Sequence, residues 1–130
     1  MDTNATSSAA SHNAATFGEY ITEKRKQRTL PASQVCEAVG ISISYYCDIE
    51  KGRRLPPDRE SLAKMAKALH LNDTETAVFY DYAGKARFEA PPDLPAYINE
   101  YEIVRVALRL AKNKGNAEDW SNFIHTLENR

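Results

Sequence analysis

Basic side chains are concentrated in one part of this 130-residue chain. Between Lys24 and Arg59, eight lysines and arginines stand against four acidic residues, so this segment has a net charge of +4. The whole chain has a formal net charge of −1, and the remainder is therefore acidic. Clustered ammonium and guanidinium groups bind phosphate oxygens, even in a protein that is nearly neutral overall. Lys51, Arg53 and Arg54 lie together in one short loop and are the first candidates for such contacts.

The segment that leads into this loop, from Ala32 to Lys51, has the spacing of two short helices that cross at a tight turn. Gly40 supplies the turn, because the residue that ends a helix often needs a positive φ. A small residue, Cys36, lies where the helices cross, and apolar residues recur where each helix must be buried (Val35, Val39, Ile41, Tyr46 and Ile49). This spacing indicates a helix-turn-helix, whose second helix is presented to DNA.

The predicted second helix, residues 42–50, places polar residues on its outer side. A step of 100° per residue puts Ile49 and Ser42 beside a buried Tyr46, and Ser44, Cys47, Asp48 and Lys51 opposite it. Ser42 can cap the helix. Ser44 can contact a base edge or a phosphate, or it can serve as a first-turn cap. Tyr45 can pack its ring while its hydroxyl reaches a phosphate, or it can be wholly buried.

Asp48 is the least expected residue on this outer side, because phosphates repel a carboxylate. Two interpretations remain open. Asp48 could accept a hydrogen bond from cytosine N4, or it could form an ion pair with Arg53, Arg54 or Lys51.

The periodicity along the chain predicts an all-α protein. Residues 1–15 are small and polar and are expected to be disordered. Residues 16–83 carry the signals of five helices, and the prolines within residues 84–96 predict a linker. Residues 97–130 are predicted to form a C-terminal helical extension with two apolar stripes, broken near Gly115. Such stripes must pack on the main domain or on another chain, because two small helices cannot hide them from water.

Residues 17–83 resemble the Cro/C1-type (XRE) helix-turn-helix family. The residues that carry the resemblance are GISISYY from Gly40, IEKGRR from Ile49, the proline that follows, and the LAKMAKALHL helix. The resemblance implies a five-helix, lambda-repressor-like DNA-binding domain whose helix 42–50 enters the major groove. It also implies dimers that read two half-sites about one helical turn apart. The stretch GKARFEAPPDLPAYI is similar to the tail of many small bacterial regulators of this group.

The resemblance also implies roles for single residues. Ile43 matches a position that commonly reads a base, where an apolar side chain favours a thymine methyl group, although it could instead contact the preceding helix. Lys51, Arg53 and Arg54 match the loop that grips the DNA backbone, although they could instead be solvated surface charges. Arg25 is expected to form a structural salt bridge with Glu50.

The chain departs from the family at the first residue of the preceding helix. The family often has Gln there, and this chain has Ala32. Ser33 and Gln34 could compensate for that change.

The leading hypothesis is a sequence-specific regulator of transcription that binds a palindromic operator in double-stranded DNA as a homodimeric repressor. An alternative is an antitoxin or adaptor that holds a partner protein through residues 97–130 and binds DNA for autoregulation. The sequence suggests neither an enzyme nor a cofactor or metal site, because His12, His70 and His125 lack partners at metal-ligand spacing. Two cysteines, interpreted as free thiols, and the lack of an apolar span predict a cytoplasmic protein. The resemblance implies that it is encoded by a bacterium or phage.

Overall fold

The computed structural model describes residues 14–130 and contains eight α-helices and no strand within that range. The prediction of an all-α protein is confirmed. The chain divides after Asp93 into two compact units. The predicted tail falls mostly outside the described residues, since only its last two positions, Ala14 and Ala15, are included.

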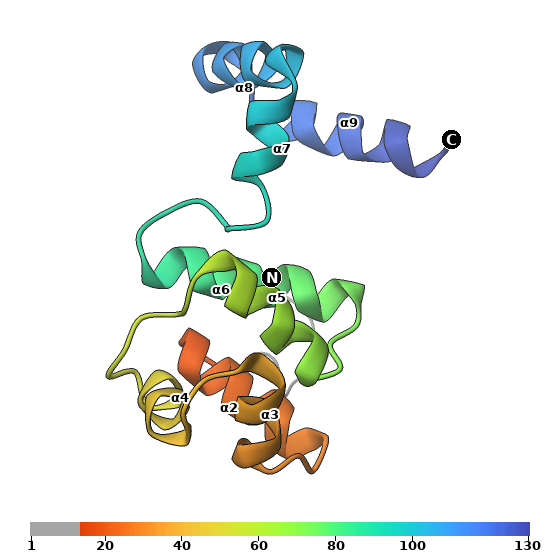
Figure 1. Cartoon of the computed structure of the whole chain (residues 1–130). Coiled ribbons are helices and arrows are strands. Elements are labelled where there is room, and N and C mark those ends of the chain that lie inside the picture. Colours follow the sequence, from red (N-terminus) through yellow and green to blue (C-terminus); the bar gives the residue numbers. More distant parts are fainter. Residues whose placement is uncertain (1–13) are drawn as a thin grey trace. The chain divides into compact units, whose positions relative to one another are not determined.

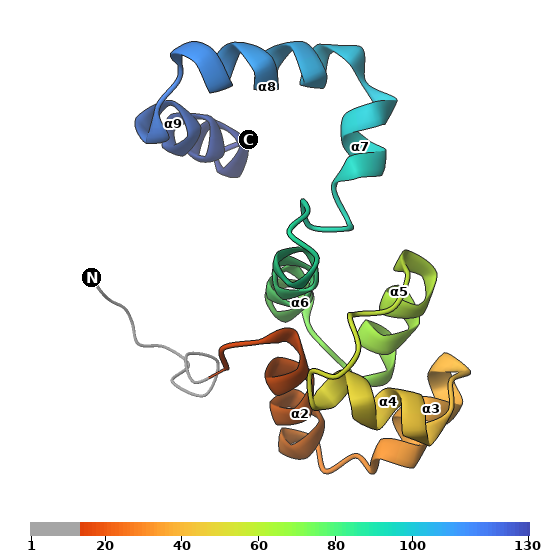
Figure 2. The ribbon, with the colours of Figure 1, turned by 90° about the vertical axis from the view of Figure 1, so that its left-hand side faces the viewer.

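The first unit contains five helices (Figures 1 and 2). They are α2 (Phe17–Gln27), α3 (Ala32–Val39), α4 (Ile43–Glu50), α5 (Arg59–Ala68) and α6 (Asp73–Ala86). Helix α3 contacts both α4 and α5, while α2 contacts α4 and α6. Helix α5 thus packs on α3, and α2, which itself packs on α6, packs on α4. The sides of α3 and α4 that face away from these helices can contact another molecule.

A single hydrophobic core holds these helices together. Its fully buried side chains come from all five of them, including Ile21, Val35, Tyr46, Ile49, Leu62, Met65, Leu69 and Phe79. The rings of Phe17 and Phe79 pack with centroids 5.2 Å apart, which joins α2 to α6. Burial of one such side chain stabilises the fold by about 1.5–3 kcal/mol. The apolar positions that the sequence assigned to the two crossing helices therefore face this core.

Side-chain caps determine where most of these helices begin. Thr16, Ser42 and Asp58 each accept a hydrogen bond from the backbone N–H three residues ahead, at 3.1, 3.1 and 2.8 Å. Helix α6 is capped by Asn72, which forms a reciprocal capping box with Glu75. Each cap satisfies a backbone donor that would otherwise lack a partner in the first turn.

Two glycines are required by the crossing of the helices. Gly40 ends α3 with φ +86°, a left-handed conformation that other residues adopt only with strain. Gly18 lies where α2 crosses α4, and a Cβ atom there would be 2.6 Å from the carbonyl oxygen of Ile49. A larger residue at position 18 would therefore push α2 away from α4.

Both ends of the first unit extend further than the sequence predicted. Ala14 is buried, and its carbonyl accepts a hydrogen bond of 2.6 Å from the Tyr82 hydroxyl, although residues 1–15 were expected to be disordered. Helix α6 continues to Ala86, inside the predicted linker of residues 84–96. After this helix the backbone of Ala90 passes within 2.8 Å of the position that a Cβ atom of residue 84 would occupy. Glycine at position 84 leaves room for this close approach.

The second unit consists of α7 (Pro95–Glu100), α8 (Glu102–Lys114) and α9 (Ala117–Glu128). Helix α7 begins at Pro95, so it too takes up part of the predicted linker. The first apolar stripe, expected to be continuous, is broken at Tyr101, whose backbone is extended (φ −121°, ψ 114°). No residue of these three helices, all of which the structure describes, is buried. Among residues 14–130, no helix is both long enough and apolar enough to span a bilayer.

Candidate nucleic-acid interface

Helix α4 presents its N-terminal turn to solvent. The Ser42 hydroxyl accepts a hydrogen bond from the Tyr45 N–H, so this serine serves as the cap of the helix. Ile43 and Ser44 follow it and are exposed, and Ile43 keeps 48% of its surface accessible. Tyr46 and Ile49 point into the core from the opposite side. The helix therefore offers a short apolar and hydroxyl-bearing tip that a partner molecule can reach.

The N-terminal part of α3 lies beside this tip. Ser33 and Gln34 line a shallow hollow of about 750 Å³ together with Ile43 and Ile41, so the structure brings together the predicted residues of both helices. Pro31 precedes α3 and supplies no side-chain cap. The Gln34 N–H donates to the Pro31 carbonyl at 3.1 Å, and no side chain caps the N–H groups of Ala32 and Ser33, which could therefore bind an anionic group such as a phosphate.

The two arginines of the loop after α4 each contact a side chain of α4. The Arg53 guanidinium is 3.5 Å from the Asp48 carboxylate, so of the three basic residues proposed as partners for Asp48, the structure brings Arg53 to it. The Arg54 guanidinium lies over the Tyr45 ring, 5.6 Å from its centroid. A cation over an aromatic face is attracted by the ring quadrupole, which restricts the arginine without neutralising it. Lys51 and Gly52 are exposed between α4 and these arginines.

An ion pair between Arg25 and Glu50 connects α2 to the end of α4. Arg25 donates two hydrogen bonds to the Glu50 carboxylate, at 2.7 and 3.2 Å, and a third of 3.0 Å to the Leu30 carbonyl. The two side chains are only 15% and 11% exposed. Burial raises the pKa of Glu50, but the hydrogen bonds and positive charge of Arg25, together with smaller effects of neighbouring polar groups, outweigh it and hold that pKa below its usual value.

Comparison with known proteins matches the same region. Residues 16–79 match the model of a family described as "Helix-turn-helix domain". The "ImmF control region 10 kDa protein" of Bacillus phage phi105 is 36% identical over 56 residues, which cover 43% of this chain. Residues 16–79 form a helix-turn-helix domain. This agrees with their resemblance to the Cro/C1-type (XRE) group. The match spans 61% of the phage protein's length. No solved structure matches the chain.

The helix-turn-helix domain contains a second ion-pair cluster that the sequence did not reveal. Glu75 at the start of α6 accepts a hydrogen bond of 2.6 Å from Arg28 and lies 3.3 Å from the Lys24 ammonium. Burial opposes the charge on Glu75, but these two cations and the Asn72 N–H prevail and lower its pKa to about 2. Lys24 is only 4% exposed and also lies over the Tyr20 ring. The cluster joins α2 to α6.

This cluster changes how the basic charge of the helix-turn-helix domain is divided. Of the eight basic residues between Lys24 and Arg59, three (Lys24, Arg25 and Arg28) are paired with carboxylates inside the fold. The exposed cations are Lys26, Lys51, Arg53, Arg54 and Arg59. Three of these five lie in the loop after α4, so the exposed positive charge is concentrated at the C-terminal end of that helix.

The described residues include no group of three or more His, Cys, Asp or Glu side chains that could hold a metal ion. Cys36 is buried and Cys47 is half-buried, and both are free thiols. The pKa of Cys36 is raised because burial disfavours the thiolate. The exposed side chains of α4 and the loop after it include hydroxyl groups, cations and the apolar side chain of Ile43.

Proposed function

We propose that this chain regulates transcription by binding an operator in double-stranded DNA, and that it does so as a homodimeric repressor. The observation that carries the proposal is the juxtaposition of the exposed tip of α4 with the arginine loop and the uncapped start of α3. An α-helix is about 10–12 Å wide with its side chains, which fits the major groove of B-form DNA. Helix α4 is the element that would enter it.

Bases would be read by the first turn of α4. Ile43 can contact a thymine methyl group, which the major groove exposes at every A·T pair. Ser42 and Ser44 add short hydroxyl groups that can donate or accept. Because no long bidentate side chain stands on this turn, part of the selectivity would come from DNA shape and from the spacing of half-sites.

Phosphates would be held on both sides of that helix. Arg54, kept in place by Tyr45, and Lys51 would contact the backbone from the loop, and Ser33 and Gln34 would do so from the start of α3. Arg53 would offset the charge of Asp48, which otherwise repels the DNA. This arrangement assigns a structural purpose to the carboxylate at position 48, since it orients the loop through Arg53.

Repression would follow from where the dimer binds on the DNA. A dimer on two half-sites covers roughly one helical turn on each side of the operator centre, and polymerase cannot occupy the same DNA. The relative from phage phi105 is named for a control region, and this name is consistent with a regulatory role for the shared domain.

The direct test measures how DNA affinity depends on salt. Arg54→Ala should weaken binding to every sequence by about tenfold and reduce the slope of log K against log salt by about one. Lys67→Ala provides the matched control, because it removes an exposed cation that belongs to neither α3, α4 nor the loop after α4. Equal losses for the two variants would show that the charge effect is not specific to the loop, and the proposal would be wrong.

A second candidate keeps DNA binding but assigns residues 97–130 to a partner protein, as in an antitoxin or adaptor. The exposure of large apolar side chains on α7–α9 favours some occupant of this surface. The mass of the purified protein in solution separates the two candidates. A dimer supports the repressor, whereas a monomer that dimerises neither alone nor on DNA supports the partner protein.

A further inference from the structure

Helices α8 and α9 carry an apolar surface that the rest of the second unit does not cover. Large apolar side chains are about half exposed from Leu94 onward: Leu94, Tyr97, Tyr101, Ile103, Val106, Leu108, Leu110, Trp120, Phe123, Ile124 and Leu127. Ile103, Val106 and Leu110 follow helical spacing on α8, and Trp120, Phe123 and Leu127 do so on α9. Each helix therefore has a stripe suited to packing against another helix.

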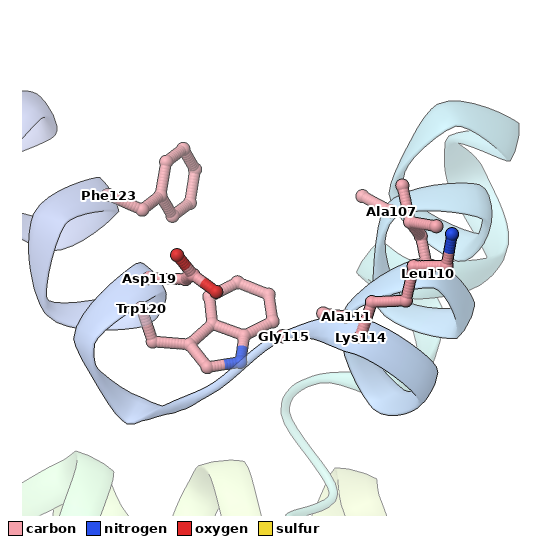
Figure 3. A pocket seen from close by; sticks show the side chains of 8 residues that line it. All are labelled: Ala107, Leu110, Ala111, Lys114, Gly115, Asp119, Trp120 and Phe123. Carbon is pink, nitrogen blue, oxygen red and sulfur yellow. The ribbon is translucent and has the colours of Figure 1, made fainter.

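Helix α9 does not fill the stripe of α8 within the same chain. A hollow of about 530 Å³ lies between the two helices, and side chains from both line it (Figure 3). Leu110 and Ala111 face it from α8, and Trp120 and Phe123 face it from α9. The hollow is almost entirely apolar, apart from Lys114 and Asp119. Its mainly apolar lining suits another apolar helix better than a hydrophilic ligand.

The two helices have opposite charges. Helix α8 contains four basic residues and one acidic residue, which gives +3. Helix α9 contains three acidic residues and no lysine or arginine, which gives −3. A second copy of this chain therefore presents to each helix a partner that is apolar on one side and opposite in charge.

We propose that two copies associate through these helices, with α8 of each copy packed against α9 of the other. The inference rests on the dimer of the proposed function and specifies how it forms. A two-fold axis makes the two α8–α9 contacts equivalent, so both surfaces are used at once. Like-charged contacts of α8 with α8 or of α9 with α9 are avoided.

The available area suffices for such a dimer. Eight of these side chains lie on α8 and α9; half exposed and at roughly 150 Å² each, they amount to on the order of 600 Å² per copy. Two copies would thus bury about 1,200 Å², the lower end of the range for specific, stable interfaces. Aromatic residues are prominent in it, as they are at the centres of protein interfaces.

Charge reversal on one helix at a time tests the pairing in the full chain. The first variant, Arg109→Glu with Lys112→Glu, changes α8 from +3 to −1. The second, Glu118→Lys with Glu128→Lys, changes α9 from −3 to +1. Arg105 and Asp119 are left intact, because Arg105 donates to the carbonyls of Ile98 and Asn99 and Asp119 completes the capping box of α9.

The proposal expects each variant alone to have a dimer dissociation constant at least about tenfold above that of the unchanged protein. An equimolar mixture should form dimers that contain one copy of each variant, because both α8–α9 contacts then join opposite charges. Native mass spectrometry and sedimentation identify these species. Restored association also shows that both variants are folded.

Three results would overturn the pairing. The unchanged protein could be monomeric, either variant could dimerise as well as the unchanged protein, or the mixture could stay monomeric. The last result would place the α8–α9 contact within one chain. DNA binding is measured separately on a single half-site at low salt. If the unchanged protein does not bind this DNA, the proposed function is refuted, whereas the measured association of the two copies still stands.

Discussion

The ion pair between Arg25 and Glu50 should be a principal link between α2 and α4. Both side chains are mostly buried and their bidentate hydrogen bonds measure 2.7 and 3.2 Å. Loss of one partner leaves the other charge partly buried, which costs about 3–5 kcal/mol in a fully buried pair. Because 11–15% of each side chain remains exposed, we expect Arg25→Ala and Glu50→Ala each to lower the free energy of unfolding by about 2–4 kcal/mol.

The two single substitutions should differ in a definite direction. Arg25 also donates to the Leu30 carbonyl at the turn between α2 and α3, so its loss removes a further contact. Arg25→Ala should therefore be more destabilising than Glu50→Ala by about 1 kcal/mol. Urea unfolding followed by circular dichroism gives each value, provided that the slope against urea is unchanged.

A double-mutant cycle isolates the interaction itself. The expected coupling between Arg25 and Glu50 is about 2 kcal/mol. The pair Asp48–Arg53 provides a matched control from the same helix, because its atoms are 3.5 Å apart and its side chains are 32% and 67% exposed. Its coupling should stay below about 0.5 kcal/mol. Equal couplings for the two pairs would refute the argument that burial sets their strength.

Three further predictions concern packing, acid stability and specificity. Gly18→Ala should destabilise the domain by about 1–3 kcal/mol, because its Cβ would collide with the Ile49 carbonyl; a melting temperature equal to that of the unchanged protein would contradict this. Because the pKa of Glu75 falls from 4.5 to about 2 on folding, its contribution is complete above the unfolded value and disappears as the pH falls from about 4.5 to 2. After allowance for solvent screening this amounts to on the order of 2 kcal/mol, and Glu75→Gln should flatten the acid limb of stability against pH; an unchanged slope would assign that limb to other groups. Ser44→Ala should alter relative affinities among operator variants by about threefold while leaving the salt slope unchanged; a uniform loss across sequences would instead make Ser44 a phosphate contact.

The sequence predicted the first unit well because its helix boundaries are encoded locally. Gly40 and the caps Ser42 and Asp58 fix the ends of short helices through their own backbone and side-chain chemistry. The apolar periodicity between these signals then has only one way to face a core. For this reason the positions of Tyr46 and Ile49 in the core followed from counting residues along one helix.

Features that depend on distant residues could not be predicted in this way. Lys24 looked like one more surface cation, and only the position of Glu75 at the start of α6 makes it a buried ion-pair partner. The break at Tyr101 lies inside an apolar stripe that continues on both sides, so periodicity offered no signal. The linker was predicted to begin at residue 84, whereas α6 continues to Ala86 and the missing side chain of Gly84 leaves room for the Ala90 backbone.

The contacts that single residues make at the candidate DNA interface also could not be predicted from the sequence. Three basic residues were possible partners for Asp48, and the turn after α4 brings Arg53 to it. The position of Arg54 over Tyr45 depends on the same turn. Both contacts are consequences of how the loop folds back, which residue spacing along a helix does not describe.

In the proposed function, the first turn of α4 reads bases while the loop after α4 holds phosphates. Selection of bound DNA from a random pool, performed in parallel with the unchanged protein and with Ile43→Gln and Arg54→Ala, tests it most directly. We expect Ile43→Gln to change the preferred base at one position of each half-site, from thymine toward a base that Gln can bind, while Arg54→Ala yields the original sequence with weaker affinity. An unchanged preference in Ile43→Gln would contradict the claim that α4 reads the operator.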